Sequence, residues 1–449
     1  MKYQQVIDYI EQQIETGKIK GGHKLPSIRE LANLFSCNKD TVIRAYKELE
    51  LHHRVYALPK SGYYLVESGK AVADKNETID FKTTLPDSRL LPYNEFNHSI
   101  NKAIENYKQE LFSYGQVEGL ASLREVLARL FWEQQVFADQ DDILITSGAQ
   151  QALSLLVKIP FPNGQKKILV EQPSYSVLQR LLELYGFDLV GIERTAQGID
   201  LKELESLFAT QQFKFFYTIP RFHNPLGTSY SESDKKRIVE LASKYQVYLV
   251  EDDYLGDLAT HNNLALHHYD TDNRVIYVKS FSKSFMPGIR IGAAVLPEIL
   301  QQNFKQYKRY DDLTTSVLAQ GGLEVFIKSG MYKNHLKKVK YQYQNKMRFV
   351  KTCLKAAGLK NVDYSAGNSG FFIWIKLPET INAKTLALRL AQKNIEIMTS
   401  DHFYIKMCSP VNGFRLCISA LSKQQIQEGV FGIAEEIKAI SLTNRISML

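Results

Sequence analysis

Apolar residues in the first part of the chain recur three or four positions apart, in three separate stretches. This spacing predicts short helices over residues 3–14, 28–35 and 42–49. Gly17 ends the first helix, and Ser27 with Glu30 forms a capping box at the start of the second. Two apolar strands follow, RVYAL and GYYLV. Three short helices and a hairpin predict a mainly α-helical winged helix-turn-helix over residues 1–65.

Residues 66–80 break this pattern, because they are polar and almost free of large apolar side chains. Such a segment cannot build a core, and it predicts a linker. From about residue 113, apolar strands alternate with helical patterns. This alternation is typical of an α/β unit in which helices cover both faces of a mostly parallel sheet. The predicted strands are DILITSG, KKILVEQ, DLVGIE, FKFFYTIP, VYLVEDD, RVIYVKSF and RIGAAVLP.

The composition is that of a multidomain globular protein. A chain of 449 residues is too long for one core, so we expect a small domain and a two-lobed larger unit, residues 81–449. No apolar run is long enough to cross a bilayer, so no membrane partner is expected. The 4 cysteines fit neither a metal nor a disulfide spacing, which indicates reduced thiols, a cytoplasmic location and no metal site. The net charge of +8 weakly favours a polyanionic partner.

The polar face of the third predicted helix carries cations and a hydroxyl: Lys39, Thr41, Arg44 and Lys47. Arg29 lies near the start of the second helix. A DNA-recognition helix needs long cations for phosphates and hydrogen-bonding groups for base edges. The charges alone fit the solvated face of a small helical domain equally well.

The pattern LPSIRELA…DTVIRAYKELE…KSGYYL resembles the GntR-type winged helix-turn-helix, and the resemblance covers most of residues 1–65. It implies that the chain binds a double-stranded DNA operator. It also implies that Arg29, Thr41 and Arg44 contact the DNA, and that Gly62 lies at the tip of the wing.

Polar clusters follow five of the predicted strands: SGAQQ, EQPSY, PRFHNPLG, EDDY and SFSK. Ligands of such sheets bind beyond the carboxyl ends of the strands, so we expect these clusters to meet at one site. Taken singly, each cluster has an ordinary structural explanation, such as a turn, a helix cap or a solvated loop lysine. Their occurrence at five strand ends in order favours a site.

The chemistry of the clusters suits a phosphorylated aldehyde. Lys283 can form a Schiff base with an aldehyde cofactor. Ser280, Ser282 and Arg290 supply two hydroxyls and a cation for a phosphate dianion. Backbone amides at the start of a helix add to this anion site; that helix begins with Gly148, Ala149 and Gln150.

Four other side chains in the clusters suit the ring of the same cofactor. Asp252 is placed to hold a protonated pyridine nitrogen, and that charge makes pyridoxal phosphate an electron sink. Asn224 and Tyr254 can hydrogen-bond the phenolic oxygen of the ring, and Tyr175 can stack on its face. The residues therefore predict pyridoxal 5'-phosphate as the cofactor, attached to Lys283.

The segments SYGQVEGLASLREVLARL, TSGAQQAL, PSY, HNPLG, EDDY and SFSKSFMPGIRIG resemble the fold-type I aminotransferases, over roughly residues 85–440. The resemblance implies the same cofactor contacts and a homodimer in which Tyr114 reaches the phosphate of the partner subunit. It also implies that Arg415 binds the carboxylate of an amino acid. Phe222 and His223 depart from the usual HQNPTG motif, which bears on the substrate side. We expect a large lobe at about 113–329 and a small lobe at about 81–112 and 330–449.

A GntR-type head fused to an aminotransferase-like body resembles the MocR subfamily of bacterial transcription regulators. We therefore expect a cytoplasmic regulator that binds DNA, carries pyridoxal phosphate on Lys283 and senses an amino acid or another primary amine. The catalytic set is complete, so an aminotransferase that transfers amino groups between an amino acid and a 2-oxo acid is an alternative. A sensor of pyridoxal phosphate itself is a third.

Overall fold

The computed structural model describes residues 2–51, 54–58, 61–66, 78–359 and 362–446. The chain divides into two compact units, Met1–Glu77 and Thr78–Leu449. None of the helices in the described ranges has the length and apolar character needed to cross a membrane. These ranges also hold no group of three or more His, Cys, Asp or Glu residues that could bind a metal ion.

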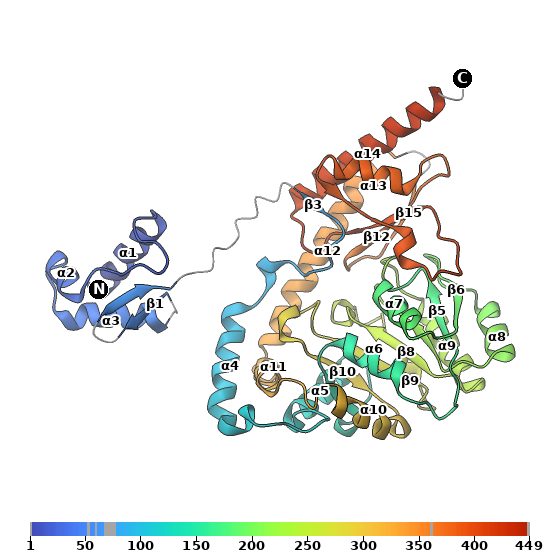
Figure 1. Cartoon of the computed structure of the whole chain (residues 1–449), viewed down its shortest axis with the longest axis horizontal. Helices are drawn as coiled ribbons and strands as arrows, with labels where there is room; N and C mark the ends of the chain where they lie inside the picture. Colours follow the sequence, from blue (N-terminus) through green and yellow to red (C-terminus); the bar gives the residue numbers. More distant parts are fainter. Residues whose placement is uncertain (1, 52–53, 59–60, 67–77, 360–361, 447–449) are drawn as a thin grey trace. The chain divides into compact units, whose positions relative to one another are not determined.

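The N-terminal unit consists of three helices followed by a two-stranded antiparallel sheet (Figure 1). The apolar faces that predicted the helices meet in one core, in which Val6, Val42 and Leu49 are buried. The predicted winged helix-turn-helix is therefore confirmed. Its elements are α1 (Lys2–Glu15), α2 (Ile28–Leu34), α3 (Lys39–Leu51), β1 (Val55–Leu58) and β2 (Gly62–Leu65).

The second helix starts as the sequence predicted. The amide of Ser27 donates to Glu30 Oε2 at 2.6 Å, and the amide of Glu30 donates to Ser27 Oγ at 3.2 Å. This reciprocal pair satisfies two donors that the helix itself leaves unpaired. It fixes the start of α2, which precedes the predicted recognition helix α3.

The centre of the C-terminal unit, within the described residues, is a seven-stranded sheet in the order β4-β10-β9-β8-β7-β5-β6. All the strands predicted from the apolar runs belong to it. Strand β10 runs antiparallel to both β4 and β9, and the other neighbours are parallel. The carboxyl ends of the other six strands therefore lie along one edge. The strands are β4 (Ile143–Thr146), β5 (Ile168–Gln172), β6 (Leu189–Glu193), β7 (Phe215–Thr218), β8 (Leu249–Asp253), β9 (Val275–Ser280) and β10 (Gly292–Val295).

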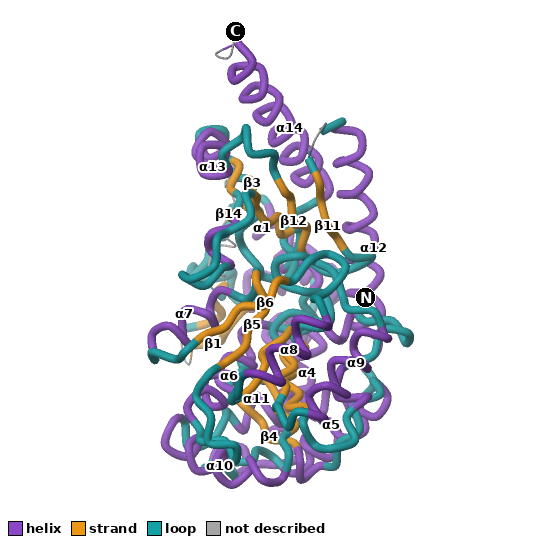
Figure 2. Tube along the Cα trace, turned by 90° about the vertical axis from the view of Figure 1, so that its right-hand side faces the viewer, coloured by secondary structure: helices purple, strands orange, loops and turns teal. Residues whose placement is uncertain are grey.

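Helices cover both faces of this sheet, as Figure 2 shows. Leu144 faces one core, whereas its neighbours Ile143 and Ile145 face the opposite one, because successive strand residues point to opposite sides. The first core includes α6 (Ala149–Lys158), α7 (Ser176–Leu184) and α10 (Glu298–Asp311). The opposite face packs on α5 (Ala121–Glu133), α8 (Leu201–Thr210), α9 (Glu232–Lys244) and α11 (Val317–Lys328).

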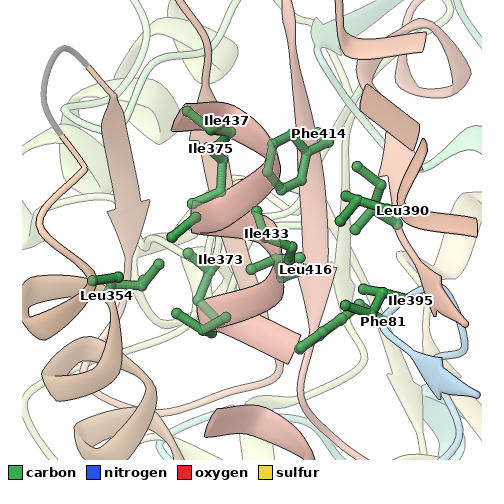
Figure 3. Packing of buried hydrophobic residues seen from close by; sticks show 14 of the residues in the cluster. Phe81, Leu354, Ile373, Ile375, Leu390, Ile395, Phe414, Leu416, Ile433 and Ile437 are labelled. Atoms are coloured by element: carbon green, nitrogen blue, oxygen red, sulfur yellow. The ribbon is translucent and has the colours of Figure 1, made fainter. Parts of the chain in front are cut away.

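A second sheet, in the order β11-β12-β15-β14 with antiparallel neighbours, forms the small lobe. Ile373 of β12 and Leu416 of β15 pack with Ile433 of the last helix in a core of their own (Figure 3). The elements are β11 (Asp363–Ala366), β12 (Phe372–Lys376), β14 (Met398–Thr399), β15 (Gly413–Cys417), α12 (Met331–Ala357), α13 (Ala383–Ala391) and α14 (Lys423–Ile446).

The sequence did not predict β3 (Ile79–Asp80), which pairs in parallel with β13 (Ile395–Glu396). Ile79 lies in the core of the small lobe, so the last residues assigned to the linker at 66–80 belong to the folded unit. Residues 67–77 lie outside the described ranges. A strand of two residues is too short to show a period-two pattern, and this is why the boundary was placed too late.

Helix α4 (Tyr93–Tyr107) falls in the stretch assigned to the small lobe, yet it lies against α11 of the large lobe (Figure 1). Two glycines of α11 make the approach close. A Cβ at Gly322 would lie 2.4 Å from Ile100 Cδ1, and one at Gly321 would lie 3.3 Å from Ala103 Cβ. The apolar stripe of α4 predicts a buried face but not which lobe covers it.

Candidate functional site

The polar clusters at the strand ends surround one cavity of 260 Å³ in the C-terminal unit. The large lobe supplies most of its wall, and Thr84, Leu85 and Phe372 close it from the side of the small lobe. The predicted residues on its wall are Ala149, Gln150, Tyr175, Asn224, Asp252, Tyr254, Ser280, Ser282, Lys283 and Arg290. The edge of the sheet thus brings together residues that lie far apart in the sequence, as strand topology requires.

Lys283 lies in the turn that follows β9. Its Nζ donates to the carbonyl oxygen of Thr84 at 2.8 Å and lies 3.0 Å from Thr84 Oγ1. Burial lowers the pKa of Lys283 below its ordinary value, and the charges of Arg415 and Arg290 act in the same direction. A lower pKa leaves a larger share of the amine unprotonated, and only the unprotonated amine attacks an aldehyde.

An anion-binding corner forms where β9 and β4 end on either side of β10. The amide of Ser282 donates to Ser280 Oγ at 3.2 Å, while the buried hydroxyl of Ser282 has no partner among the described residues. Arg290 donates to the Ser147 carbonyl at 3.2 Å. Gly148, the N-cap of α6, has a φ of 87°, and a Cβ there would lie 2.8 Å from Arg290 Nη2. Glycine thus lets the guanidinium approach the N-terminus of α6, an arrangement that suits a phosphate.

Asp252 presents an unsatisfied carboxylate oxygen in the same cavity. Its Oδ2 accepts a hydrogen bond from the Tyr217 hydroxyl at 2.7 Å, whereas its Oδ1 is buried without a partner among the described residues. Burial raises the pKa of Asp252 to about 7, and the bond from Tyr217 opposes this shift. A buried oxygen of this kind is costly unless a donor reaches it, and a protonated ring nitrogen is such a donor.

The other predicted ring contacts have partners within the chain. The hydroxyl of Tyr175 donates to Gln150 Oε1 at 3.3 Å, and burial raises the pKa of Tyr175 to about 12. The hydroxyl of Tyr254 donates to the carbonyl of Phe222. Both tyrosines therefore stay protonated near neutral pH, and a phenol oxygen that donates one hydrogen bond can still accept another.

Arg415 is buried in β15 beside this cavity. Its Nη1 donates to Asn224 Oδ1 at 3.1 Å and its Nη2 to the Lys82 carbonyl at 2.6 Å. The guanidinium carbon lies 4.7 Å from the ring centre of Phe372 and 5.0 Å from that of Phe403. Two rings and two acceptors hold the guanidinium in a fixed orientation, and its Nε has no partner among the described residues. It is therefore placed to bind a carboxylate that enters beside Asn224.

These residues fit pyridoxal phosphate. The unpaired Oδ1 of Asp252 suits the protonated ring nitrogen, and the unpaired hydroxyl of Ser282, beside Arg290, suits the phosphate. Lys283 lies on the same wall, as attachment to the aldehyde requires. The unpaired atoms of Asp252 and Ser282 thus each match a polar group of the cofactor.

Sequence reasoning missed Thr84, Phe372 and Tyr217, which contact Lys283, Arg415 and Asp252 respectively. It also missed Glu171, whose Oε2 lies 3.2 Å from His223 Nε2 in the interior. His223, which stands within the divergent motif, does not line the cavity, and its Nδ1 accepts from the Leu226 amide at 3.4 Å in the turn that carries Asn224. A glutamate directly after the apolar residues of a buried strand was the one available signal for this contact.

Tyr114 lies outside the cavity. Its side chain is 89% exposed and lines a separate groove with Glu118, Arg124 and Lys305. Within one chain, therefore, it does not join the other predicted cofactor contacts. An exposed tyrosine of this kind is available to a second subunit.

The predicted DNA contacts lie on the surface of the N-terminal unit. Arg29 of α2 and Arg44 of α3 are exposed, and Thr41 is half-buried at the start of α3. The guanidinium carbon of Arg44 lies 4.5 Å from the ring centre of Tyr3. Gly62 begins β2 with a φ of 116°; residues 59–60 of the wing lie outside the described ranges.

The fold and the site define a class: a winged helix-turn-helix joined to an aminotransferase-like unit whose cavity fits pyridoxal phosphate. Two family profiles agree. "Bacterial regulatory proteins, gntR family" matches residues 2–65, and "Aminotransferase class I and II" matches residues 89–433. The chain belongs to the GntR-type transcriptional regulators that carry an aminotransferase class I and II domain, which is the MocR architecture. The family and the residues of the cavity support pyridoxal phosphate as the cofactor.

Relatives match the chain along nearly its whole length. It is 43% identical to the uncharacterized HTH-type transcriptional regulator YcxD of Bacillus subtilis, across 96% of this chain and 98% of that protein. It is 28% identical to the uncharacterized HTH-type transcriptional regulator YdcR of Escherichia coli, across 90% of this chain and 92% of that protein. Both relatives thus span the two units.

Solved aminotransferases share the fold of the C-terminal unit. A kynurenine aminotransferase of Pyrococcus horikoshii superposes with a TM-score of 0.76 at 28% identity, over 81% of this chain and 91% of that one. An alpha-aminoadipate aminotransferase of Thermus thermophilus, complexed with N-(5'-phosphopyridoxyl)-L-leucine, superposes with a TM-score of 0.75 at 28% identity. The match covers 82% of this chain and 94% of that one. The predicted fold-type I aminotransferase fold is confirmed.

Proposed function

We propose that this protein is a DNA-binding transcription regulator whose aminotransferase-like unit holds pyridoxal phosphate on Lys283 and senses an amino acid or another primary amine. The observation that carries the proposal is the convergence of Lys283, Asp252 and the Arg415–Asn224 pair on one cavity, in a chain that also carries a winged helix-turn-helix. A regulator that used the aminotransferase fold only as a scaffold would not require these cofactor- and ligand-binding side chains together at one cavity.

Each residue has a distinct part in binding. The cofactor supplies an aldehyde carbon that bonds to amines. Lys283 provides the attachment point, Asp252 holds the ring, and Ser280, Ser282, Arg290 and the start of α6 hold the phosphate. Arg415 selects ligands that carry a carboxylate, because its buried guanidinium is oriented by Phe372 and Phe403. The ligand class is therefore an amine, with α-amino acids favoured.

We place the regulator in the cytoplasm as a homodimer with shared sites, in which Tyr114 contacts the phosphate bound by the partner subunit. The 89% exposure of Tyr114, away from the cavity of its own chain, supports this arrangement. Arg29, Thr41 and Arg44 contact the operator, with Gly62 in the wing.

An aminotransferase is the second candidate, and the lowered pKa of Lys283 favours it, because proton transfer by a lysine needs a neutral amine. A sensor of pyridoxal phosphate itself uses the same cavity without a further ligand.

One titration separates these functions. The visible spectrum of the protein with pyridoxal phosphate is followed as amino acids and amines are added, and DNA binding is measured in parallel. A spectral change that stops after one ligand equivalent, together with changed DNA affinity, supports the regulator. Continued production of a 2-oxo acid supports the enzyme, and a change of DNA affinity on cofactor addition alone supports the cofactor sensor. If DNA affinity responds to none of these additions, the regulatory proposal is wrong.

A further inference from the structure

Residues 81–85 form a strap that crosses the site between two fixed ends. At one end Phe81 is buried in the core of the small lobe, and beyond the other end Asp87 accepts a hydrogen bond from Lys346 at 2.9 Å. Between them the strap presents successive carbonyl oxygens as acceptors. The Lys82 carbonyl accepts a hydrogen bond from Arg415 Nη2 at 2.6 Å, and the Thr84 carbonyl accepts one from Lys283 Nζ at 2.8 Å.

The strap therefore holds the two groups that the proposed ligand needs. Two other carbonyls of the strap bind fixed groups: Phe81 accepts from the Cys417 amide at 2.9 Å, and Leu85 accepts from the Ser419 hydroxyl at 2.6 Å. These two contacts hold the strap in place whether or not Lys283 is bonded to Thr84.

Thr84 is the only hydrogen-bond partner of Lys283 Nζ among the described residues, and it offers two acceptors. An amine nitrogen in a partly buried cavity is costly when it has no partner. A lysine nitrogen bonded to an aldehyde carbon keeps at most one N–H donor, whereas a free amine has two or three. The two acceptors of Thr84 therefore suit the free amine of Lys283.

We propose that Thr84 is the receiving site for the Lys283 amine when an amine ligand displaces it from the cofactor, and that Thr84 thereby sets ligand affinity. The inference rests on the proposed function. In the exchange, the ligand nitrogen bonds to the aldehyde-derived carbon and the bond from that carbon to Lys283 Nζ breaks. Two protons pass from the ligand nitrogen to Nζ, and no water, oxidant or reductant is consumed.

The position of Thr84 makes it a positioning residue rather than a catalytic one. Its hydroxyl stabilises the displaced lysine, whereas the attached lysine has its nitrogen committed to the cofactor. A contact made in only one of two states shifts the equilibrium toward that state. Thr84 therefore favours displacement of the lysine by a ligand and opposes its attachment to the cofactor.

The test compares three variants of the full-length protein with the wild type. Thr84→Val removes the hydroxyl and keeps the carbonyl, and Thr84→Ser restores a hydroxyl. The matched control is Thr83→Val, because the described structure shows no hydrogen bond to the Thr83 hydroxyl. Methoxyamine serves as the probe amine, and the visible spectrum reports cofactor binding and lysine displacement separately.

We expect Thr84→Val to require about three- to tenfold more methoxyamine for half-displacement, the loss of one hydrogen bond. It should bind pyridoxal phosphate at least as tightly as the wild type, because attachment of Lys283 no longer breaks a contact with the Thr84 hydroxyl. Thr84→Ser and Thr83→Val should match the wild type. If Thr84→Val also matches it, or if Thr83→Val is equally impaired, the receiving-site proposal is overturned while the proposed function stands. If the wild type forms no cofactor band at all, both fail.

Discussion

The hydroxyl of Tyr217 donates to Asp252 Oδ2 at 2.7 Å, and the other carboxylate oxygen is left without a partner among the described residues. Tyr217 thus fixes the orientation of the carboxylate and leaves its second oxygen for the cofactor. Burial nevertheless raises the pKa of Asp252 to about 7 from an ordinary value of 3.8. The raised pKa of Asp252 has a measurable consequence for the stability of the fold.

A folded-state pKa above the ordinary value means that folding takes up a proton between roughly pH 4 and pH 7. The free energy of unfolding should therefore fall across this window as the pH rises, by at most about 1.4 kcal/mol per pH unit from Asp252. The substituted side chain of the Asp252→Asn variant is uncharged at every pH, so this pH dependence of the free energy of unfolding should be absent from the variant. Urea unfolding of both proteins without cofactor measures the difference, and the comparison cancels other groups such as Glu251, whose pKa burial also raises to about 7.

The stability difference between variant and wild type should grow in favour of Asp252→Asn from pH 4 to pH 7. A constant difference would contradict the assignment of that pKa. The same variant should bind pyridoxal phosphate at least about tenfold more weakly, since a hydrogen bond to a charged group is lost. Spectral titration with the cofactor at pH 8 measures this loss.

Arg415 should discriminate between amines by their carboxylates. Aminooxyacetate and methoxyamine carry the same reactive nitrogen, but only the first has a carboxylate. Wild-type protein should bind aminooxyacetate more tightly, and Arg415→Gln should reduce this preference by about tenfold or more while methoxyamine binding persists. The methoxyamine result also shows that the variant is folded. Should the preference survive in Arg415→Gln, the carboxylate is held by another group.

The shared dimer site makes a prediction about mixed subunits. Lys283→Ala removes cofactor attachment in its own chain, and Tyr114→Phe removes the proposed phosphate contact in the partner's site. A heterodimer of the two variants would hold one site with both residues intact. At limiting cofactor, an equal mixture should regain about one quarter of the wild-type absorption band, the fraction of sites that random pairing restores. Native mass spectrometry checks that subunits exchange; no recovery despite exchange would place Tyr114 outside the site.

The strand pattern predicted residues that follow strand ends, whereas Arg415, within β15, was indicated only by the family resemblance. Lys283, Asp252 and Asn224 each follow an apolar run, and parallel topology alone brings such positions together. The contacts that orient them were not predictable in this way. Thr84 lies 199 residues from Lys283 in the sequence, and nothing in its local pattern indicates a partner. Periodicity shows which face of an element is buried, but not what covers it, and this is also why the packing of α4 on α11 was not predicted.

DNA binding should depend on Arg44 and on the ring beneath it. The guanidinium of Arg44 lies 4.5 Å from the ring centre of Tyr3, so α1 holds the side chain that α3 presents. Arg44→Ala should weaken binding to a DNA fragment selected by the wild-type protein. If Arg44 contacts a phosphate, the Arg44→Ala substitution should also reduce the slope of log affinity against log salt concentration by about 1.

Tyr3→Leu keeps the charge of Arg44 and loses only its orientation, so affinity should fall by about two- to fivefold with an unchanged salt slope. The cofactor absorption band is the control for both variants and should not change, because neither residue lies in the C-terminal unit. Undiminished affinity in Arg44→Ala would remove this residue from the operator contacts. Equal salt slopes with reduced affinity in both variants would instead indicate that Arg44 reads a base edge rather than a phosphate.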